Sequence, residues 1–274
     1  QRPASTARIT ITFGQPMAPA SVEERFRIDP SVEGDFLWEG NTLVFLPRLA
    51  LMPGQAYTVT LEQGALSQAG RATTRDLVWS FVPRAPGILY LAPADATIRS
   101  LWFVSFDGTG AHEVYAAQYG ISDFAPSPEG SRIALTMYHG DGSTDIWLID
   151  AVGTNPHRIT DCAPGACANP VWSPDGKLLA YERQDPPMPG QLGTSPSRVW
   201  LLDLETGETA PVYEDNQVLG FSPRWSLRGQ RLAFFDANAQ GIRVLNLESG
   251  RAAIIPSVMG EVGAFAPDGQ RMIY

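Results

Sequence analysis

Residues 170–181 read Pro-Val-Trp-Ser-Pro-Asp-Gly-Lys-Leu-Leu-Ala-Tyr, a short apolar segment, a four-residue turn and a second apolar segment. Pro174 fixes the φ angle of an early turn position, the Asp175 side chain can bond its own backbone, and Gly176 can adopt a positive φ. The Leu-Leu-Ala-Tyr run has the length and bulk of a buried strand. The pattern therefore predicts a tight hairpin whose second strand is buried.

The same unit occurs four times in the second part of the chain. The other copies, each a turn followed by an apolar strand, lie at residues 127–135, 226–234 and 266–274. The turn glycines Gly130, Gly176, Gly229 and Gly269 follow one another at intervals of 46, 53 and 40 residues. Periods of about 40 to 50 residues with four strands per unit are typical of β-propeller blades. The third turn, Ser-Leu-Arg-Gly, departs from the Ser-Pro-Asp-Gly pattern, although the apolar strands on both sides of it match those of the other copies.

Each complete unit continues with an apolar strand that ends in Asp or Asn, at residues 145–150, 198–203 and 242–246. A glycine-containing turn and a fourth strand then close the unit. Over residues 88–274 these units resemble the WD-repeat-like blades of TolB-type propellers. That resemblance implies four antiparallel strands per blade, named a to d from the innermost outward, with the Ser-Pro-Asp-Gly turn between strands a and b.

The first and last units are incomplete. The segment from Ile88 matches strands b, c and d without a preceding strand a, and the sequence ends at Tyr274, just after strand b of a fifth unit. About four and a half blades are therefore expected, whereas most propellers of this resemblance have six or seven. We expect the sequence to be a piece of a longer protein, with an open ring whose edge strands need covering.

Residues 1–83 are predicted to form a separate β-sandwich, joined to the propeller by a Pro- and Gly-rich linker at residues 84–87. Apolar runs separated by turn signals predict strands at residues 8–13, 36–38, 42–45, 57–61 and 77–81. The Ala20–Phe26 segment is expected to form one helical turn with Ser21 as its N-cap.

The sequences at residues 13–17, 38–43 and 53–59 carry a resemblance to a known family. They read Phe-Gly-Gln-Pro-Met, Trp-Glu-Gly-Asn-Thr-Leu and Pro-Gly-Gln-Ala-Tyr-Thr-Val. Together with their spacing they resemble the bacterial Ig-like domain family over residues 7 to 83. The resemblance implies a surface or exported protein and a spacer or adhesion module. The expected fold class is thus all-β, an immunoglobulin-like sandwich followed by a β-propeller.

Composition excludes several classes of function. The chain has 274 residues, a formal net charge of −9 and 44% hydrophobic residues. The acidic balance disfavours a nucleic-acid partner, because no Lys/Arg cluster offsets it. No apolar run has the roughly 18 residues that a membrane helix needs. Since the sequence starts at Gln1, a cleaved signal peptide, a membrane anchor upstream and an artificial boundary all stay open.

The two cysteines, Cys162 and Cys167, flank a short Ala-Pro-Gly-Ala loop. A loop-closing disulfide, two free thiols and a metal site are the alternatives. A metal site is disfavoured, because a closed zinc site normally has four ligands and no further His or Cys lies nearby. A disulfide is favoured, and it would place the protein outside the cytoplasm in a periplasmic, cell-surface or secreted location.

No motif predicts catalysis or a cofactor. The sequence lacks a G-x-S-x-G elbow, and residues 220–224 come closest without the second glycine. His112, His139 and His157 fall in different units with no carboxylate pattern near them. The 141–145 segment resembles part of a calcium loop, but a hairpin turn explains it better. Trp147, Trp172, Trp200 and Trp225 are expected to pack between blades.

The longer loops are the expected binding surface. In a four-stranded blade the b–c and d–a loops share one rim, and the irregular loops at residues 137–144, 162–167 and 184–197 all belong to it. Variable loops on a rigid scaffold often carry binding, although a tolerated surface insertion explains the last one equally well. The candidate rim residues are His139, Asp141, Asp185, Met188, Gln191 and Leu192.

The predicted function is a non-enzymatic, extracytoplasmic binding or scaffold module of a bacterial envelope or secreted protein. Its partner would be a protein, peptide or glycan on this rim, and the oligomeric state stays open. One alternative is the substrate-gating propeller of a prolyl-oligopeptidase-like peptidase whose catalytic domain lies outside this sequence. A second is a propeller lyase or glycan hydrolase.

Overall fold

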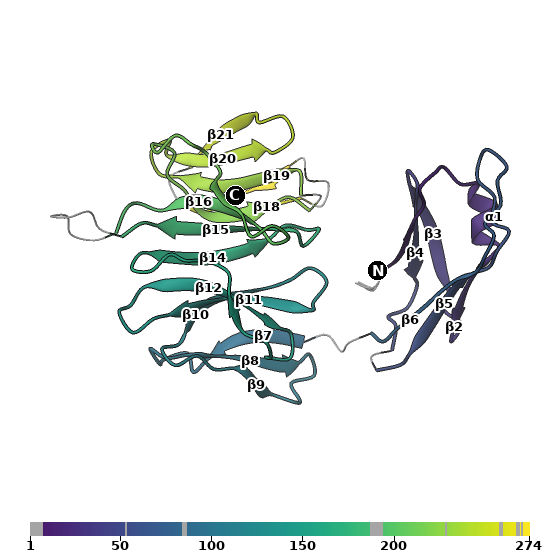
Figure 1. The fold of residues 1–274 in the computed structure, drawn as a ribbon, viewed down its shortest axis with the longest axis horizontal. Coiled ribbons are helices and arrows are strands. Elements are labelled where there is room, and N and C mark those ends of the chain that lie inside the picture. Colours follow the sequence, from purple (N-terminus) through teal and green to yellow (C-terminus); the bar gives the residue numbers. More distant parts are fainter. Residues whose placement is uncertain are drawn as a thin grey trace. The chain divides into compact units, whose positions relative to one another are not determined.

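The computed structural model of the chain describes residues 8–52, 54–83, 87–186, 194–227, 229–257, 260–266, 269 and 271–274. The chain forms two compact units, the first built chiefly from residues up to Gly87 and the second chiefly from residues beyond it (Figure 1). Strands dominate both units, as the all-β prediction requires.

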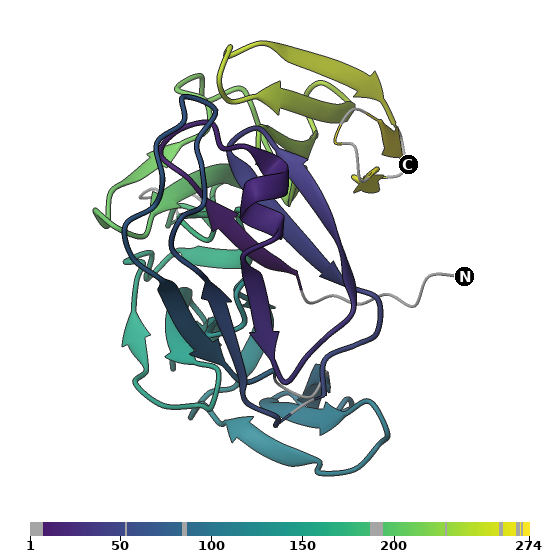
Figure 2. The same ribbon diagram turned by 90° about the vertical axis from the view of Figure 1, so that its right-hand side faces the viewer.

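The N-terminal unit is a sandwich of two three-stranded antiparallel sheets (Figure 2). One sheet contains, in spatial order, β1 (Ile9–Thr12), β4 (Thr42–Pro47) and β3 (Gly34–Glu39). The other contains β2 (Phe26–Asp29), β5 (Tyr57–Leu61) and β6 (Leu77–Phe81). Residues alternate between buried and exposed along β1, so every second side chain enters the core. There the rings of Phe26 and Phe45 lie 5.0 Å apart between centroids.

The helical turn in this unit begins earlier than predicted. Helix α1 spans Pro19–Glu23 and its N-cap is Ala18, so the prediction of Ser21 as N-cap is wrong. Pro19 suits the first helical position because its φ is fixed and its missing N–H would have no helical partner there. Ser21 instead lies inside the helix, where its Oγ accepts a hydrogen bond from the N–H of Leu66. The chain then continues directly into β2, which the sequence did not predict.

The second unit follows the repeat. A three-stranded sheet contains β7 (Gly87–Ala92), β8 (Ser100–Ser105) and β9 (His112–Tyr115). The first four-stranded blade contains β10 (Ile121–Pro126), β11 (Arg132–Tyr138), β12 (Thr144–Asp150) and β13 (His157–Arg158). The second contains β14 (Ala166–Trp172), β15 (Leu178–Gln184), β16 (Arg198–Asp203) and β17 (Thr209–Pro211). The third contains β18 (Phe221–Trp225), β19 (Arg231–Asp236), β20 (Gly241–Asn246) and β21 (Ala252–Pro256). A pair, β22 (Ala264–Phe265) and β23 (Met272–Ile273), follows.

The repeated turns have the geometry that their sequence predicts. Their four glycines have φ values of +70°, +72°, +72° and +67°. Asp175 Oδ1 accepts a hydrogen bond of 3.1 Å from the N–H of Lys177, within its own turn. The turn serine adds a second contact, since Ser173 Oγ accepts from the N–H of Leu178 at 2.9 Å. Ser127 and Ser226 make the equivalent contact at 3.0 Å.

Tryptophan side chains join neighbouring blades at their inner strands. The indole N–H of Trp172 donates to the carbonyl of Ala125 at 2.9 Å, and that of Trp225 donates to the carbonyl of Val171 at 3.1 Å. Each bond runs from one inner strand to the inner strand before it in the chain. The guanidinium of Arg132 lies over the Trp172 ring, 4.9 Å from its centroid. These contacts fix the spacing between successive blades.

Replacing Ser173 with alanine is expected to lower the free energy of unfolding by about 1–2 kcal/mol, because the N–H of Leu178 then loses its acceptor. Urea unfolding of the Ser173→Ala variant measures this loss. Ser131→Ala is the matched control, because the Ser131 hydroxyl donates to the Glu129 carboxylate at an exposed site. An equal loss in both variants would contradict the role assigned to the turn serine.

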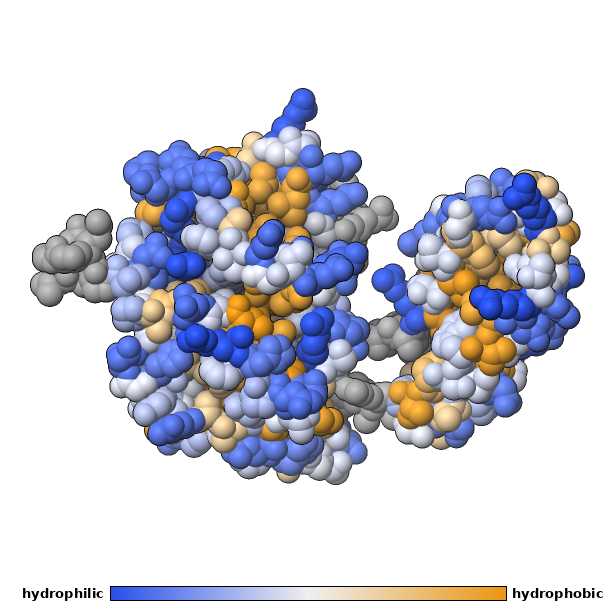
Figure 3. Space-filling view, in the orientation of Figure 1, coloured by the Kyte–Doolittle hydropathy of each residue, from blue (hydrophilic) through white to orange (hydrophobic). Residues whose placement is uncertain are grey.

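Hydrophilic residues cover much of the surface of both units on the face seen in Figure 3. Among the described residues, no helix has the length and apolar character needed to cross a membrane.

Candidate functional site

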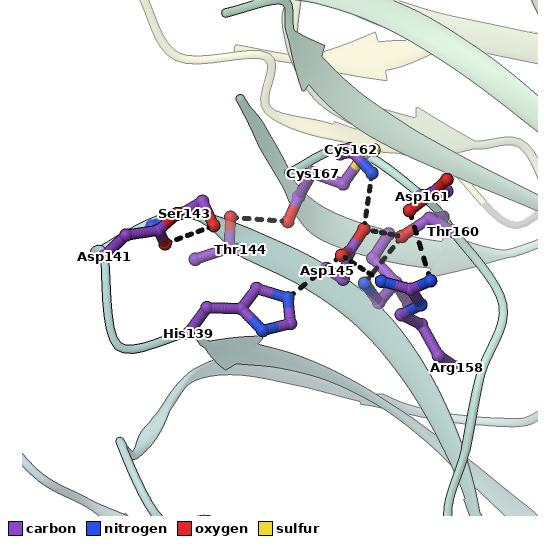
Figure 4. A network of polar contacts seen from close by, with 11 residues as sticks. His139, Asp141, Ser143, Thr144, Asp145, Arg158, Thr160, Asp161, Cys162 and Cys167 are labelled. Carbon is purple, nitrogen blue, oxygen red and sulfur yellow. Dashed lines mark hydrogen bonds and ion pairs between the residues drawn. A yellow bond between two sulfur atoms is a disulfide. The ribbon is translucent and has the colours of Figure 1, made fainter. Parts of the chain in front are cut away.

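Two loops on one rim of the second unit meet around the buried side chain of Asp145 (Figure 4). The first, the b–c loop of the first four-stranded blade, runs from His139 to Ser143. The second, which we call the cysteine loop, runs from Cys162 to Cys167 and leads into β14. Their contact follows the expectation that b–c and d–a loops share a rim.

The carboxylate of Asp145 is fully buried and has partners at both oxygens. Its Oδ1 accepts hydrogen bonds from Thr160 Oγ1 at 2.8 Å and from the N–H of Cys162 at 2.7 Å. Its Oδ2 lies 3.0 Å from His139 Nε2 and 3.4 Å from Arg158 Nη1. Such complete pairing offsets the cost of burying a charge. One side chain thereby ties together the b–c loop, the outer strand β13 and the cysteine loop.

A disulfide closes the cysteine loop. Cys162 and Cys167 are bonded, with their Cα atoms 5.8 Å apart. The hydroxyl of Thr144 donates to the carbonyl of Cys167 at 2.9 Å, which attaches the end of the loop to β12. At Gly165 an ideal Cβ would lie only 2.3 Å from the carbonyl oxygen of Gln184, so the loop packs there against backbone and leaves no room for a side chain. The cysteine loop is thus held from three sides.

The structure brings some of the predicted rim residues together. His139 belongs to the Asp145 cluster. Asp141 is exposed and accepts two hydrogen bonds from Ser143, at 2.9 Å from its N–H and 2.6 Å from its hydroxyl. Asp185 accepts a hydrogen bond of 3.0 Å from Arg183 Nε and lies just after Gln184, beside the cysteine loop. Met188, Gln191 and Leu192 lie outside the described residues.

The expectation that no histidine has a carboxylate near it is wrong for His139, whose ring contacts Asp145. Among the described residues no hydroxyl or thiol is hydrogen-bonded to His139, and the hydroxyls of Ser143 and Thr160 donate to aspartates instead. The contacts of this arrangement anchor the b–c loop and the cysteine loop.

Repeat symmetry supports the anchoring role of Asp145. In the next blade Arg198 occupies the same place in strand c, since Asp145 pairs with Met137 and Arg198 with Arg183 at matching positions of strand b. The Arg198 guanidinium donates to the carbonyls of Tyr213 and Asp215, which belong to the loop after its own blade. Both blades therefore use a charged side chain at this position to hold the loop that leads to the next blade. The equivalent position of the third four-stranded blade is Gly241, so the repeats share no residue type here that could have revealed Asp145 from the sequence.

A second polar cluster lies on the inner strands and was not predicted. Asp123, Asn169 and Ser222 each stand four residues before a turn serine, at irregular points of β10, β14 and β18. The Glu182 carboxylate accepts hydrogen bonds from Asn169 Nδ2 at 2.6 Å and from the N–H of Ser222 at 2.8 Å. Burial raises the pKa of Asp123, while the backbone N–H of Phe124 opposes the shift. Glu182 thereby joins the inner strands β14 and β18 of successive blades.

The hydrogen bonds from the Ser143 hydroxyl and N–H lower the pKa of Asp141 below its ordinary value. Because the folded pKa lies below the unfolded one, Asp141 adds stability above the unfolded pKa of about 3.9, and this is lost as the pH falls through the folded pKa. Ser143→Ala is expected to raise the Asp141 pKa, measured by NMR titration of the carboxyl carbons. Asp203, whose pKa is lowered by the N–H groups of Thr206 and Glu205, should not change in the same experiment.

Comparison with known proteins agrees with this architecture. Residues 2–82 match the family model described as "Bacterial Ig-like domain". The Tol-Pal system protein TolB of Nitratidesulfovibrio vulgaris is 34% identical over 55 residues, which are 20% of this chain and 12% of that protein. The crystal structure of TolB from Acinetobacter baumannii aligns with a TM-score of 0.53 at 15% identity, covering 78% of this chain and 52% of that one. An oligogalacturonate lyase solved with manganese aligns with a TM-score of 0.50 at 14% identity, covering 96% and 85%.

At these identities the structural matches establish the fold and nothing of the chemistry. The chain spans 12% of the curated TolB and about half of the solved TolB, at 52%. The turn repeat, the consecutive antiparallel blades and these alignments agree with one another. Residues 2–82 are similar to bacterial Ig-like domains, and the unit that follows has the β-propeller fold seen in the solved TolB.

Proposed function

We propose that this chain is a non-catalytic binding module of a bacterial envelope or secreted protein, which holds a protein, peptide or glycan partner on the rim of the b–c and d–a loops. The observation that carries the proposal is the buried Asp145 cluster with its disulfide. It fixes the backbone of two adjacent rim loops before any partner arrives. Loops held in this way lose little conformational entropy on binding.

Exposed tyrosine side chains on this rim are available for contacts with a partner. Tyr119 and Tyr138 are 46% and 37% exposed, and both lie next to the b–c loop that begins at His139. The Tyr119 ring approaches Gly140 so closely that a Cβ there would lie 3.1 Å from the ring. Tyrosine offers an apolar ring and a hydroxyl with few rotatable bonds, which is why it is enriched in protein interfaces.

Two further features support the location and the lack of catalysis. A bacterial Ig-like domain precedes the propeller, and a disulfide within the rim is the kind of bond that persists outside the cytoplasm. His139 is bonded to a carboxylate without a nucleophile beside it in the described part of the chain. The proposal therefore assigns the rim to recognition.

The test compares a rim variant with a control on the opposite rim. The immobilised chain is offered an envelope extract and a glycan array, and any ligand found is measured by titration with purified protein. Tyr119→Ala combined with Asp141→Ala should weaken binding at least tenfold, about 1.4 kcal/mol. Leu227→Ala, at a 64% exposed residue of an a–b turn, should leave binding unchanged. Equal binding by the rim variant and the control would refute the proposal.

The long b–c loop of the second four-stranded blade can be tested without harming the fold. Its stem is closed by two hydrogen bonds, from the N–H of Asp185 to Ser195 Oγ at 2.8 Å and from the N–H of Ser195 to the carbonyl of Asp185 at 2.9 Å. Replacing residues 186–194 with a short Gly-containing turn is expected to keep the unfolding midpoint and to abolish partner binding. A variant that binds as well as the parent would assign this loop to tolerated surface insertion.

A further inference from the structure

A cleft of about 370 Å³ lies between the first and second four-stranded blades. Arg158 of β13 and Thr160 line one side, and Tyr181 and Arg183 of β15 with Thr209 of β17 line the other. The volume falls within the range of small-ligand sites, about 300–1,000 Å³. The function proposed above uses some of these residues to anchor loops but assigns no ligand to the cleft.

The guanidinium of Arg183 is held in place within the cleft. It lies over the Trp200 ring, 4.5 Å from its centroid, and its Nε donates to Asp185 Oδ1 at 3.0 Å. In the described part of the chain its two terminal nitrogens donate to no carboxylate and no carbonyl. A planar guanidinium that is fixed by stacking offers two parallel donors to an oxyanion.

Arg158 brings a second guanidinium to the same cleft. It lies 3.4 Å from Asp145 Oδ2 and 3.2 Å from Asp161 Oδ1. The Asp161 side chain is 82% exposed and that of Asp185 is 56% exposed. Such exposed ion pairs stabilise a protein by about 0–1 kcal/mol at most, so a ligand can replace these carboxylates at little cost.

The buried side chain of Tyr181 also lines the cleft. Tyr181 is fully buried, and burial raises its pKa, so its phenol keeps its proton at neutral pH. The Tyr181 hydroxyl interacts with Thr209 and Arg183. The cleft thus presents two guanidiniums, and the exposed carboxylates of Asp161 and Asp185 are their displaceable partners.

We propose that this interblade cleft is a binding site for a small oxyanion group, a carboxylate or a phosphate, which bridges Arg158 and Arg183 in place of Asp161 and Asp185. Each of the two guanidiniums already pairs with an exposed carboxylate, Arg158 with Asp161 at 3.2 Å and Arg183 with Asp185 at 3.0 Å, so each accepts an oxyanion as its partner.

The test is calorimetric titration of the whole chain with inorganic phosphate and, separately, with glutarate, in a buffer low in chloride. Saturable binding is expected for at least one of them. Binding of phosphate would indicate a phosphate group as the natural ligand, and binding of glutarate would indicate a carboxylate. Arg183→Gln should weaken binding about tenfold or more, since a hydrogen bond to a charged group contributes about 1.5–3 kcal/mol. Arg183→Lys, which keeps the charge but loses the planar fork, should weaken it as well.

A variant that is expected to bind the anion more tightly completes the test, because a folding defect would weaken binding and could not imitate this result. Asp161→Asn removes the competing carboxylate at an exposed position and should strengthen binding. Arg251→Gln is the control, because it removes one positive charge from an exposed site on the third four-stranded blade. Absence of saturable binding by both anions, equal weakening by Arg251→Gln, or unchanged affinity in Asp161→Asn would each overturn the proposal.

Discussion

Replacing Asp145 with alanine is expected to lower the free energy of unfolding by about 3 kcal/mol or more. The substitution leaves two donors, the N–H of Cys162 and the hydroxyl of Thr160, without the acceptor that they share inside the protein. It also removes the counter-charge of Arg158 and the carboxylate that contacts the His139 ring. The cysteine loop would remain closed by its disulfide and bonded to Thr144 at Cys167, but it would lose its attachment to β12 at Cys162.

Urea unfolding measures the loss, and amide hydrogen exchange at Cys162 shows whether the loop has been released. Asp161→Ala is the matched control, because this 82% exposed carboxylate pairs with the same arginine. It should change stability by less than about 1 kcal/mol. His139→Ala should cost less than Asp145→Ala, since the His139 side chain is 31% exposed and water can replace its contact. A loss below 1 kcal/mol for Asp145→Ala would show that the cluster does not hold the rim.

The propeller architecture could be predicted because its signal is local and repeated. The turn of Ser173 to Gly176 specifies its own backbone through a proline, an Asx contact and a glycine with positive φ. Its recurrence sets the length of a blade without any knowledge of tertiary contacts. Each predicted strand that follows a repeated turn is present in the structure, as β11, β15, β19 and β23.

The Asp145 cluster could not be predicted in the same way, because its members come from separate segments. His139 precedes the strand, Arg158 lies on β13, and Thr160 and Cys162 belong to the connection that follows. In the sequence Asp145 is only the first residue of an apolar strand, where a surface position is the simple interpretation.

The helix N-cap was also predicted wrongly. Ser21 is a good N-cap by residue type, but Pro19 determines where the helix begins.

The sequence placed the b–c loop and the cysteine loop on one rim, whose role in binding stays a prediction, and it did not identify what holds the loops. His139 and the cysteine loop lie together on one rim, and Asp141 closes a turn there. Loop length and irregularity carry that information. The buried charge that anchors the loops becomes visible only in the structure, where Asp145 and Arg198 occupy equivalent positions of two blades.

Replacing Trp172 with alanine is expected to lower the free energy of unfolding by about 3–5 kcal/mol, the usual cost of truncating a buried aromatic side chain. Trp172 is 8% exposed and belongs to the core between the first and second four-stranded blades. The substitution leaves a cavity there, removes the stacking surface of Arg132 and deletes the indole N–H that bonds the carbonyl of Ala125. Thermal and urea unfolding measure the loss.

Phenylalanine at the same position separates the packing contribution from the hydrogen bond. Trp172→Phe keeps most of the apolar bulk but leaves the Ala125 carbonyl without its donor, which should cost about 1–3 kcal/mol. Trp147→Phe is the matched control, because the Trp147 indole N–H is buried without a hydrogen-bond partner among the described residues. Its removal relieves an unsatisfied donor, so this variant should lose clearly less stability than Trp172→Phe. Trp225→Phe should behave like Trp172→Phe, since its indole makes the equivalent bond to Val171. If all three variants lost the same stability, the tryptophans would act through bulk alone, and the bonds between inner strands would not set the spacing of the blades.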